Sequence, residues 1–251
     1  MIIGVDGCKG GWIAVSRTHA GEVPNVEVHR HFASLLTAYP STAIIAVDMP
    51  IGLPARAGGG GRGAEQAVRP YLGQRQSSVF SVPSRSAVYA ETGVFQSEQD
   101  RYAAHRRASE VALATSKPPR KISIQAFGLF PKIRQLDEAL RSEPTLKFRV
   151  FESHPEFAFT VLNADKPMQH PKKIKGRVNP TGIEERKRLL ENFGMARNFL
   201  EQPSPKGAND DDFLDACVMM LVAGRIVKGL AKPYPNPPGE DAYGLPIAIR
   251  A

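Results

Sequence analysis

Cysteine is scarce in this sequence: Cys8 and Cys217 stand alone among 251 residues. Two cysteines cannot form a disulfide framework, and neither belongs to a CxxC pair, so we expect no structural zinc site. The sequence has no apolar run of 18 residues, and we therefore expect no helix that spans a membrane. The N-terminal segment has no basic residue before its apolar stretch and carries Asp6, which is atypical of a signal peptide. These features predict a protein of the reducing cytoplasm.

Aromatic residues make up only 8% of the chain and are scattered singly. A domain that stacks single-stranded nucleic acid on aromatic rings is therefore not expected. Lysine and arginine number 33 against 25 aspartates and glutamates, which gives a net charge of 33 − 25 = +8. This excess favours polyanionic partners such as nucleic acid or nucleotides. With 42% hydrophobic residues, the chain can form one large domain or two small ones.

The first fifty residues predict three strands, a short helix and a fourth strand. Strand patterns cover residues 2–5, 11–16 and 26–31, and a helical pattern covers residues 33–38. The run AIIAV at 43–47 is typical of a strand buried on both faces. The predicted order is therefore β-β-β-α-β, the beginning of an α/β protein.

A long segment that contains a run of four glycines follows the fourth strand. We interpret residues 53–147 as an insertion or cap within a single domain that spans residues 1–251. A capping box formed by Thr181 and Glu184 is predicted to start one of the later helices. The other predicted elements are a strand over residues 148–151 and helices over residues 98–114, 131–140, 155–162, 181–193 and 210–230.

Two acidic residues, Asp6 and Asp48, directly follow apolar strand segments. A buried carboxylate costs stability unless it is paired or bound to a ligand, although an aspartate at a strand end can also simply cap a turn. If the two strands are parallel neighbours, both side chains reach the crevice beyond the strand ends, where open α/β sheets bind ligands. Two carboxylates at such close range repel each other unless a cation joins them.

Three more acids extend this set. Glu152 follows the strand predicted over 148–151, and Asp212 and Asp215 share one face of the last helix. Capping of that helix is the alternative explanation for the acids at 210–212. Carboxylate oxygens are the ligands that Mg²⁺ or Mn²⁺ prefers, and a pair of such ions can cleave a phosphodiester. The predicted catalytic and metal-binding residues are Asp6, Asp48, Glu152, Asp212 and Asp215.

Basic residues supply the candidates for substrate binding. Arg69, Arg75 and Arg85 flank the stretch SSVFSVP, and the planar fork of arginine suits a phosphate. Their alternative role is to pair with the acids of the site or with helix ends. Lys172 and Lys173 lie in a proline-flanked loop that either binds nucleic acid or is merely solvated.

The acids after the first and fourth strands, together with the DDFLDA helix, resemble the ribonuclease-H-like superfamily. More closely, the chain resembles an uncharacterised family described as predicted ribonuclease-H-like nucleases. One departure is that relatives often carry a Cys-Asp stretch near the LGxR motif, where this chain has Ala64 and Glu65. The matching segments are GVDGCKGGW, VDMPIGLP, RPYLGQRQSSVFSVPSR, FESHPEFAF, DDFLDACVM and YGLPIAI.

The resemblance implies a ribonuclease-H-like mixed sheet flanked by helices, in which the first and fourth strands lie side by side. It also implies a carboxylate metal site, and hence a metal-dependent nuclease that acts on nucleic acid or a nucleotide phosphoester. Two alternatives stay open: an ATPase-like or phosphotransferase protein on the same core, and a non-catalytic metal- or nucleic-acid-binding protein. The chain has neither a P-loop nor a second core, which argues against the first alternative. The sequence leaves the oligomeric state open.

Overall fold

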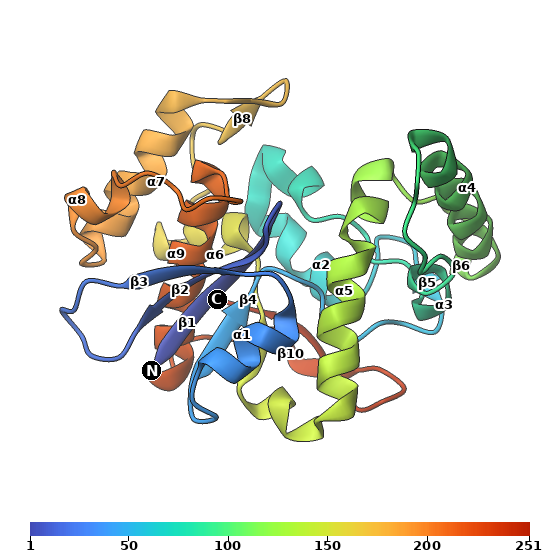
Figure 1. Cartoon of the computed structure of the whole chain (residues 1–251), viewed down its shortest axis with the longest axis horizontal. Helices are drawn as coiled ribbons and strands as arrows, with labels where there is room; N and C mark the ends of the chain where they lie inside the picture. The colour runs from blue at the N-terminus through green and yellow to red at the C-terminus, as the bar shows by residue number, and fades with distance from the viewer.

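The computed structural model describes residues 1–251 and shows an α/β protein built on a five-stranded mixed sheet flanked by helices (Figure 1). The strand order is β3-β2-β1-β4-β7. β1 pairs with β2 antiparallel and with β4 parallel, so the expected contact between the first and fourth strands is confirmed. This arrangement is compatible with a ribonuclease-H-like core. The strands are β1 (Ile2–Cys8), β2 (Gly11–Arg17), β3 (Asn25–His29), β4 (Ile44–Val47) and β7 (Val150–Glu152).

Helix α9 (Asp210–Val227) lies directly on one face of β1. A Cβ atom added to Gly4 would lie 2.0 Å from the backbone nitrogen of Met220, so only glycine permits this approach. The apolar side chains of α9, among them Val218 and Val222, form a core with Ile13 and Val15 of β2. This core also includes residues of α6 (Pro155–Leu162), α7 (Pro180–Asn192) and α8 (Arg197–Leu200).

The opposite face of the sheet packs against α1 (Phe32–Ala38) and α5 (Ile124–Ser142). Phe130 and Ile133 of α5 are buried in one cluster with Trp12, whose indole nitrogen donates to Gln135 Oε1 at 2.9 Å. The segment 53–147 therefore shares a core with the sheet. Its remaining elements are β5 (Ala57–Gly58), α2 (Gly63–Val68), η1 (Arg69–Ser78), α3 (Arg85–Val88), α4 (Glu98–Ala114), β6 (Ser116–Lys117) and η2 (Pro144–Phe148).

Helix boundaries differ from the predictions at two prolines. Helix α5 begins at residue 124 rather than 131, because Ser123 caps it by accepting from the Ala126 backbone nitrogen. Pro131 lies inside the helix, where the burial of the apolar face outweighs the usual cost of proline. Helix α7 begins at Pro180, so the capping box predicted at Thr181 and Glu184 does not form.

The C-terminal residues form a hairpin that the sequence did not predict. β10 (Pro233–Glu240) and β11 (Pro246–Arg250) pair antiparallel with a shift in register, and prolines hid the strand pattern. A second small hairpin, β8 (Lys173–Ile174) and β9 (Arg177–Val178), projects from the body beside α7 (Figure 1). None of the helices is both long and apolar enough to cross a bilayer.

Candidate metal centre

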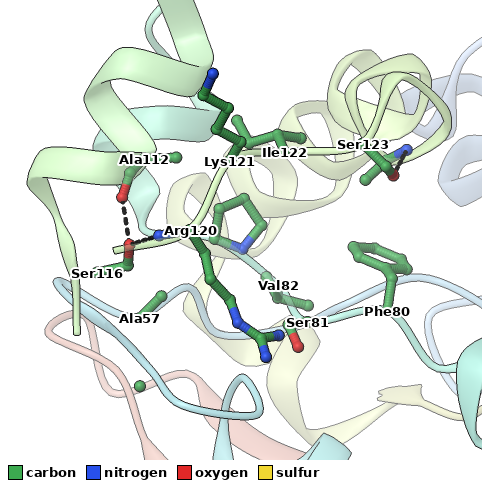
Figure 2. Close-up of a pocket in the computed structure, with 13 residues that line it drawn as sticks. Ala57, Phe80, Ser81, Val82, Ala112, Ser116, Arg120, Lys121, Ile122 and Ser123 are labelled. Carbon is green, nitrogen blue, oxygen red and sulfur yellow. Dashed lines mark hydrogen bonds between the residues drawn. The ribbon is translucent and has the colours of Figure 1, made fainter. Parts of the chain in front are cut away.

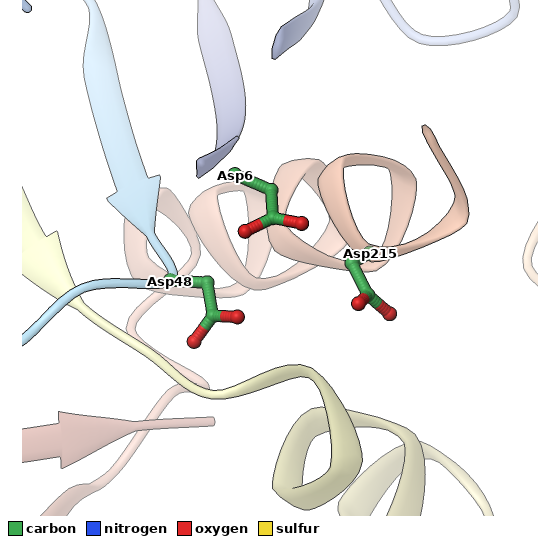
Figure 3. A group of neighbouring side chains, drawn as sticks. All are labelled: Asp6, Asp48 and Asp215. Carbon is green, nitrogen blue, oxygen red and sulfur yellow. The ribbon is translucent and has the colours of Figure 1, made fainter. Parts of the chain in front are cut away.

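Three aspartates meet at the carboxyl ends of β1 and β4 (Figure 3). Asp6 belongs to β1, Asp48 directly follows β4, and Asp215 lies in the second turn of α9. One carboxylate oxygen from each of the three lies within 4.8 Å of the other two. The parallel pairing of β1 with β4 brings the first two together, and the close approach of α9 to β1 adds the third. We call Asp6, Asp48 and Asp215 the aspartate cluster.

The three carboxylates of the aspartate cluster lie in an electrostatically unfavourable environment. Asp6 and Asp215 are buried, and Asp48 is partly exposed. Burial raises the pKa of all three carboxyl groups, and for Asp6 the neighbouring charges of Asp48 and Asp215 raise the pKa further. Oδ1 of Asp215 is buried without any hydrogen-bond donor. Such a group of oxygens favours the binding of a cation.

Lys172 provides the one positive charge in direct contact with the cluster. Its ammonium forms an ion pair with Asp215 and lies 4.0 Å from Asp211 Oδ2. Burial alone would lower the pKa of Lys172, but the charges of Asp215 and Asp6 raise it above its ordinary value. Lys172 therefore stays charged, yet one ammonium cannot neutralise three carboxylates. The residues present fit a hard divalent cation such as Mg²⁺ or Mn²⁺, because the donors are carboxylate oxygens and one of them has no partner.

Glu152 lies outside the aspartate cluster. Its Oε1 accepts from Arg62 Nη2 at 2.5 Å, and its Oε2 accepts from the Ile51 backbone nitrogen at 2.7 Å. Arg62 is itself buried and also pairs with Glu65. Burial raises the pKa of Glu152 to about 7 although the charge of Arg62 opposes the shift. Glu152 thus ties α2 to the end of β7, a contact that sequence reasoning missed because Arg62 is 90 positions away.

Asp212 caps a helix instead of joining the cluster. Its Oδ2 accepts from the backbone nitrogen of Asn209 at 2.9 Å, which makes the capping box at the start of α9. The neighbouring Asp211, which the sequence analysis did not select, is buried and lies 2.6 Å from the ammonium of Lys173. The signal that could have found Asp211 is its spacing of four residues from Asp215, which places both on one helix face.

A charged cleft of about 450 Å³ opens at Asp48. Apart from two prolines its lining has no apolar side chain. His154 closes one side, with Nε2 3.2 Å from the Ser78 carbonyl oxygen. The charged and polar side chains that line the cleft are Asp48, Gln74, Arg75, Ser77, Ser78, His154, Glu156, Lys172 and Lys173.

The predicted substrate-binding residues divide into two groups. Arg75, Lys172 and Lys173 line the cleft. Arg69 donates to the Val79 carbonyl and to Ser81 Oγ, and Arg85 pairs with Asp137 and Asp241. Neither Arg69 nor Arg85 lines the cleft: the bonds of Arg69 stay within the segment 53–147, and Arg85 also joins that segment to Asp241. Neither arginine pairs with an acid of the predicted site: Arg69 donates to carbonyl and hydroxyl oxygens, and the acids that Arg85 pairs with lie elsewhere.

Comparison with known proteins gives a family without a described activity. A family model described as "Protein of unknown function (DUF429)" matches residues 4–240. The chain belongs to this family. The family match confirms the expectation of an uncharacterised family. The matched residues include the whole aspartate cluster. No curated protein and no solved structure matches the chain.

Proposed function

We propose that this DUF429 chain is a divalent-metal-dependent hydrolase that cleaves phosphodiester bonds, in other words a nuclease on a ribonuclease-H-like core. The observation that carries this proposal is the convergence of Asp6, Asp48 and Asp215 from two adjacent parallel strands and one helix. The strand order β3-β2-β1-β4-β7 supports the assignment to the ribonuclease-H-like superfamily. Burying carboxylates so close together costs free energy of folding. A cation that binds all three would offset this cost.

Asp6, Asp48 and Asp215 would hold Mg²⁺ or Mn²⁺. When bound there, such an ion polarises a phosphoryl oxygen and makes water a better nucleophile at neutral pH. The protein contributes the rest of the site from the cleft. Asp48 borders both the cluster and the cleft, so a phosphate that enters the cleft reaches the metal site directly.

Cationic side chains from two separate segments of the chain line the cleft and orient the substrate. Arg75 comes from η1, whereas Lys172 and Lys173 come from the segment that leads into the β8–β9 hairpin. Ion pairs to Glu156 at 3.9 Å and to Asp211 at 2.6 Å position the side chains of Arg75 and Lys173. Contacts of this kind bind phosphates without reading a base sequence. Nucleic acid and nucleotide phosphoesters are therefore the proposed substrate class.

Titration calorimetry with Mg²⁺ and Mn²⁺ tests the metal site. We expect the wild type to bind either ion and Asp6→Asn to lose binding. Asp210→Asn serves as the matched control, because Asp210 lies on α9 with Asp215 but outside the cluster, is exposed and accepts a hydrogen bond from Ser204. Failure of the wild type to bind either ion at millimolar concentration would contradict the proposal and favour a non-catalytic protein.

Incubation with single-stranded, duplex and branched DNA and RNA then tests the reaction. Cleavage that requires the divalent ion and disappears in Asp6→Asn would establish the nuclease. Metal binding without cleavage of any polymer would shift the substrate to a nucleotide or another small phosphoester. Stabilisation against heat by ATP would instead support the ATPase-like alternative.

A further inference from the structure

A second cavity, of about 190 Å³, lies within the segment 53–147 (Figure 2). Its walls come from β5, from residues 80–83, from Ala112 and Ser116, and from residues 120–126, which include the start of α5. It shares no lining residue with the cleft at Asp48. Its volume is below the roughly 300–1,000 Å³ of pockets for drug-sized ligands, so it would suit a smaller molecule.

One part of this cavity is apolar. Val82, Ile122, Ala112 and Ala126 are buried and line it, and Phe80 adds a partly exposed aromatic ring. These side chains come from three separate segments of the chain, so the tertiary structure holds the apolar wall in place. An apolar group of a ligand would lose contact with water against this wall, which favours binding.

The other part of the cavity is cationic and has no counter-ion. Figure 2 shows the side chain of Arg120 extending from the backbone toward Ser81. Arg120 is exposed, and its guanidinium forms neither an ion pair nor a hydrogen bond within the protein. Lys121 is likewise exposed and unpaired at the rim. Ser123 caps the 19-residue helix α5 at the same cavity, so the positive end of the helix dipole adds to the field.

A neighbouring arginine strengthens this cationic character. Arg69 donates to the hydroxyl of Ser81, which lines the cavity, and its other acceptors are carbonyl oxygens. Burial lowers the pKa of Arg69, the negative charge of Glu65 opposes this shift, and the positive charge of Arg120 adds to it. Two guanidinium groups therefore lie close enough to repel each other. An anion bound at Arg120 would offset that repulsion.

We propose that this cavity binds a small organic anion that joins a carboxylate or phosphate group to a compact apolar or aromatic body. The anionic group lies at Arg120, and the apolar body lies against Phe80, Val82 and Ile122. This site is separate from the aspartate cluster, and binding requires no divalent metal.

Titration calorimetry on the full chain without divalent metal tests the site, with benzoate and phenyl phosphate as probes. Benzamide tests the need for charge, and inorganic phosphate tests the need for the apolar body. We expect benzoate or phenyl phosphate to bind at one saturable site, and both comparison compounds to bind at least about tenfold more weakly. The tighter of the two probes identifies the anionic group.

Arg120→Gln should weaken binding of the tighter probe at least about tenfold, because it removes a charge-assisted hydrogen bond. Arg106→Gln is the matched control, since Arg106 is an exposed arginine on α4 that does not line the cavity. NMR shifts caused by the probe should include residues 80–83 and 122–126. The proposal is overturned by no saturation up to about 10 mM, by equal binding to Arg120→Gln, or by equal binding of inorganic phosphate.

Discussion

The ammonium of Lys172 is paired with the carboxylate of Asp215 at the point where the cleft meets the aspartate cluster. Lys172 lies on the segment that leads into the β8–β9 hairpin, so it reaches the cluster from outside the sheet. In the metal-free protein this single charge offsets part of the repulsion among three carboxylates. The same ammonium also lines the route by which a phosphate would approach.

Lys172→Gln should therefore destabilise the metal-free protein by about 1–3 kcal/mol, because it leaves Asp215 buried without a partner. Saturating Mg²⁺ should restore most of this loss, since the cation takes over the charge compensation. Urea unfolding with and without Mg²⁺ measures both effects. A loss of stability that Mg²⁺ does not reduce would contradict a shared site for the ammonium and the ion.

Stability without metal should fall as the pH rises from about 4 to about 7. The folded-state pKa values of Asp6, Asp48 and Asp215 are raised from 3.8, so the native state holds protons that the unfolded state has released. Their contribution is favourable at low pH and is lost as the pH rises through the folded-state values, which for Asp48 means about 7. Urea unfolding across this range should show a smaller fall for Asp6→Asn than for the wild type. An equal fall in both proteins would mean that Asp6 does not titrate in this window.

A comparison of Glu152→Gln with Asp48→Asn should distinguish a structural carboxylate from a metal-binding one. Glu152 is paired with Arg62, so its replacement should cost about 2–4 kcal/mol of stability and leave the affinity for Mg²⁺ unchanged within about twofold. Asp48→Asn should show the opposite pattern, with Mg²⁺ affinity lower by at least about tenfold. Chemical unfolding and titration calorimetry on both variants make the comparison. A large loss of Mg²⁺ affinity in Glu152→Gln would bring Glu152 back into the metal site.

Substitutions of Arg75 and Arg85 should have different effects on substrate binding and on stability. Arg75→Gln should raise the KM for a cleaved substrate about tenfold or more, because a charge-assisted contact in the cleft is lost. Arg85→Gln should lower stability, because Asp137 and Asp241 lose their partner, and should leave KM near the wild-type value. Steady-state kinetics and thermal unfolding check these outcomes. Equal KM values in Arg75→Gln and wild type would remove Arg75 from the substrate site.

Local patterns were enough to find the aspartate cluster. Asp6 and Asp48 each follow a run of apolar residues, and Asp215 leads into an apolar helical stretch, so each stands out against its immediate neighbours. The pairing of β1 with β4 followed from the resemblance to a known superfamily. These are the parts of the site that depend on short-range pattern and simple topology.

The remaining acids could not be assigned in this way. The start of α9 at Asp210, with Asn209 as the N-cap residue, makes Asp212 the capping residue, and the packing of the helix places Asp211 at Lys173. A helix that began one residue earlier would have Asp211 instead of Asp212 at the third position, and the sequence does not distinguish the two. The pairing of Glu152 with Arg62 depends on the path of a long segment, for which no periodic pattern exists.

The positions of the three aspartates in the chain also set when, during synthesis, the aspartate cluster can first form. Asp6 and Asp48 leave the ribosome early, but Asp215 follows 215 − 48 = 167 residues after Asp48. At about 5–20 residues per second this interval lasts roughly 8–33 s. Until α9 arrives, the face of β1 at Gly4 lacks its covering helix and the metal site lacks one wall. A nascent chain, or one truncated before α9, therefore cannot assemble the aspartate cluster.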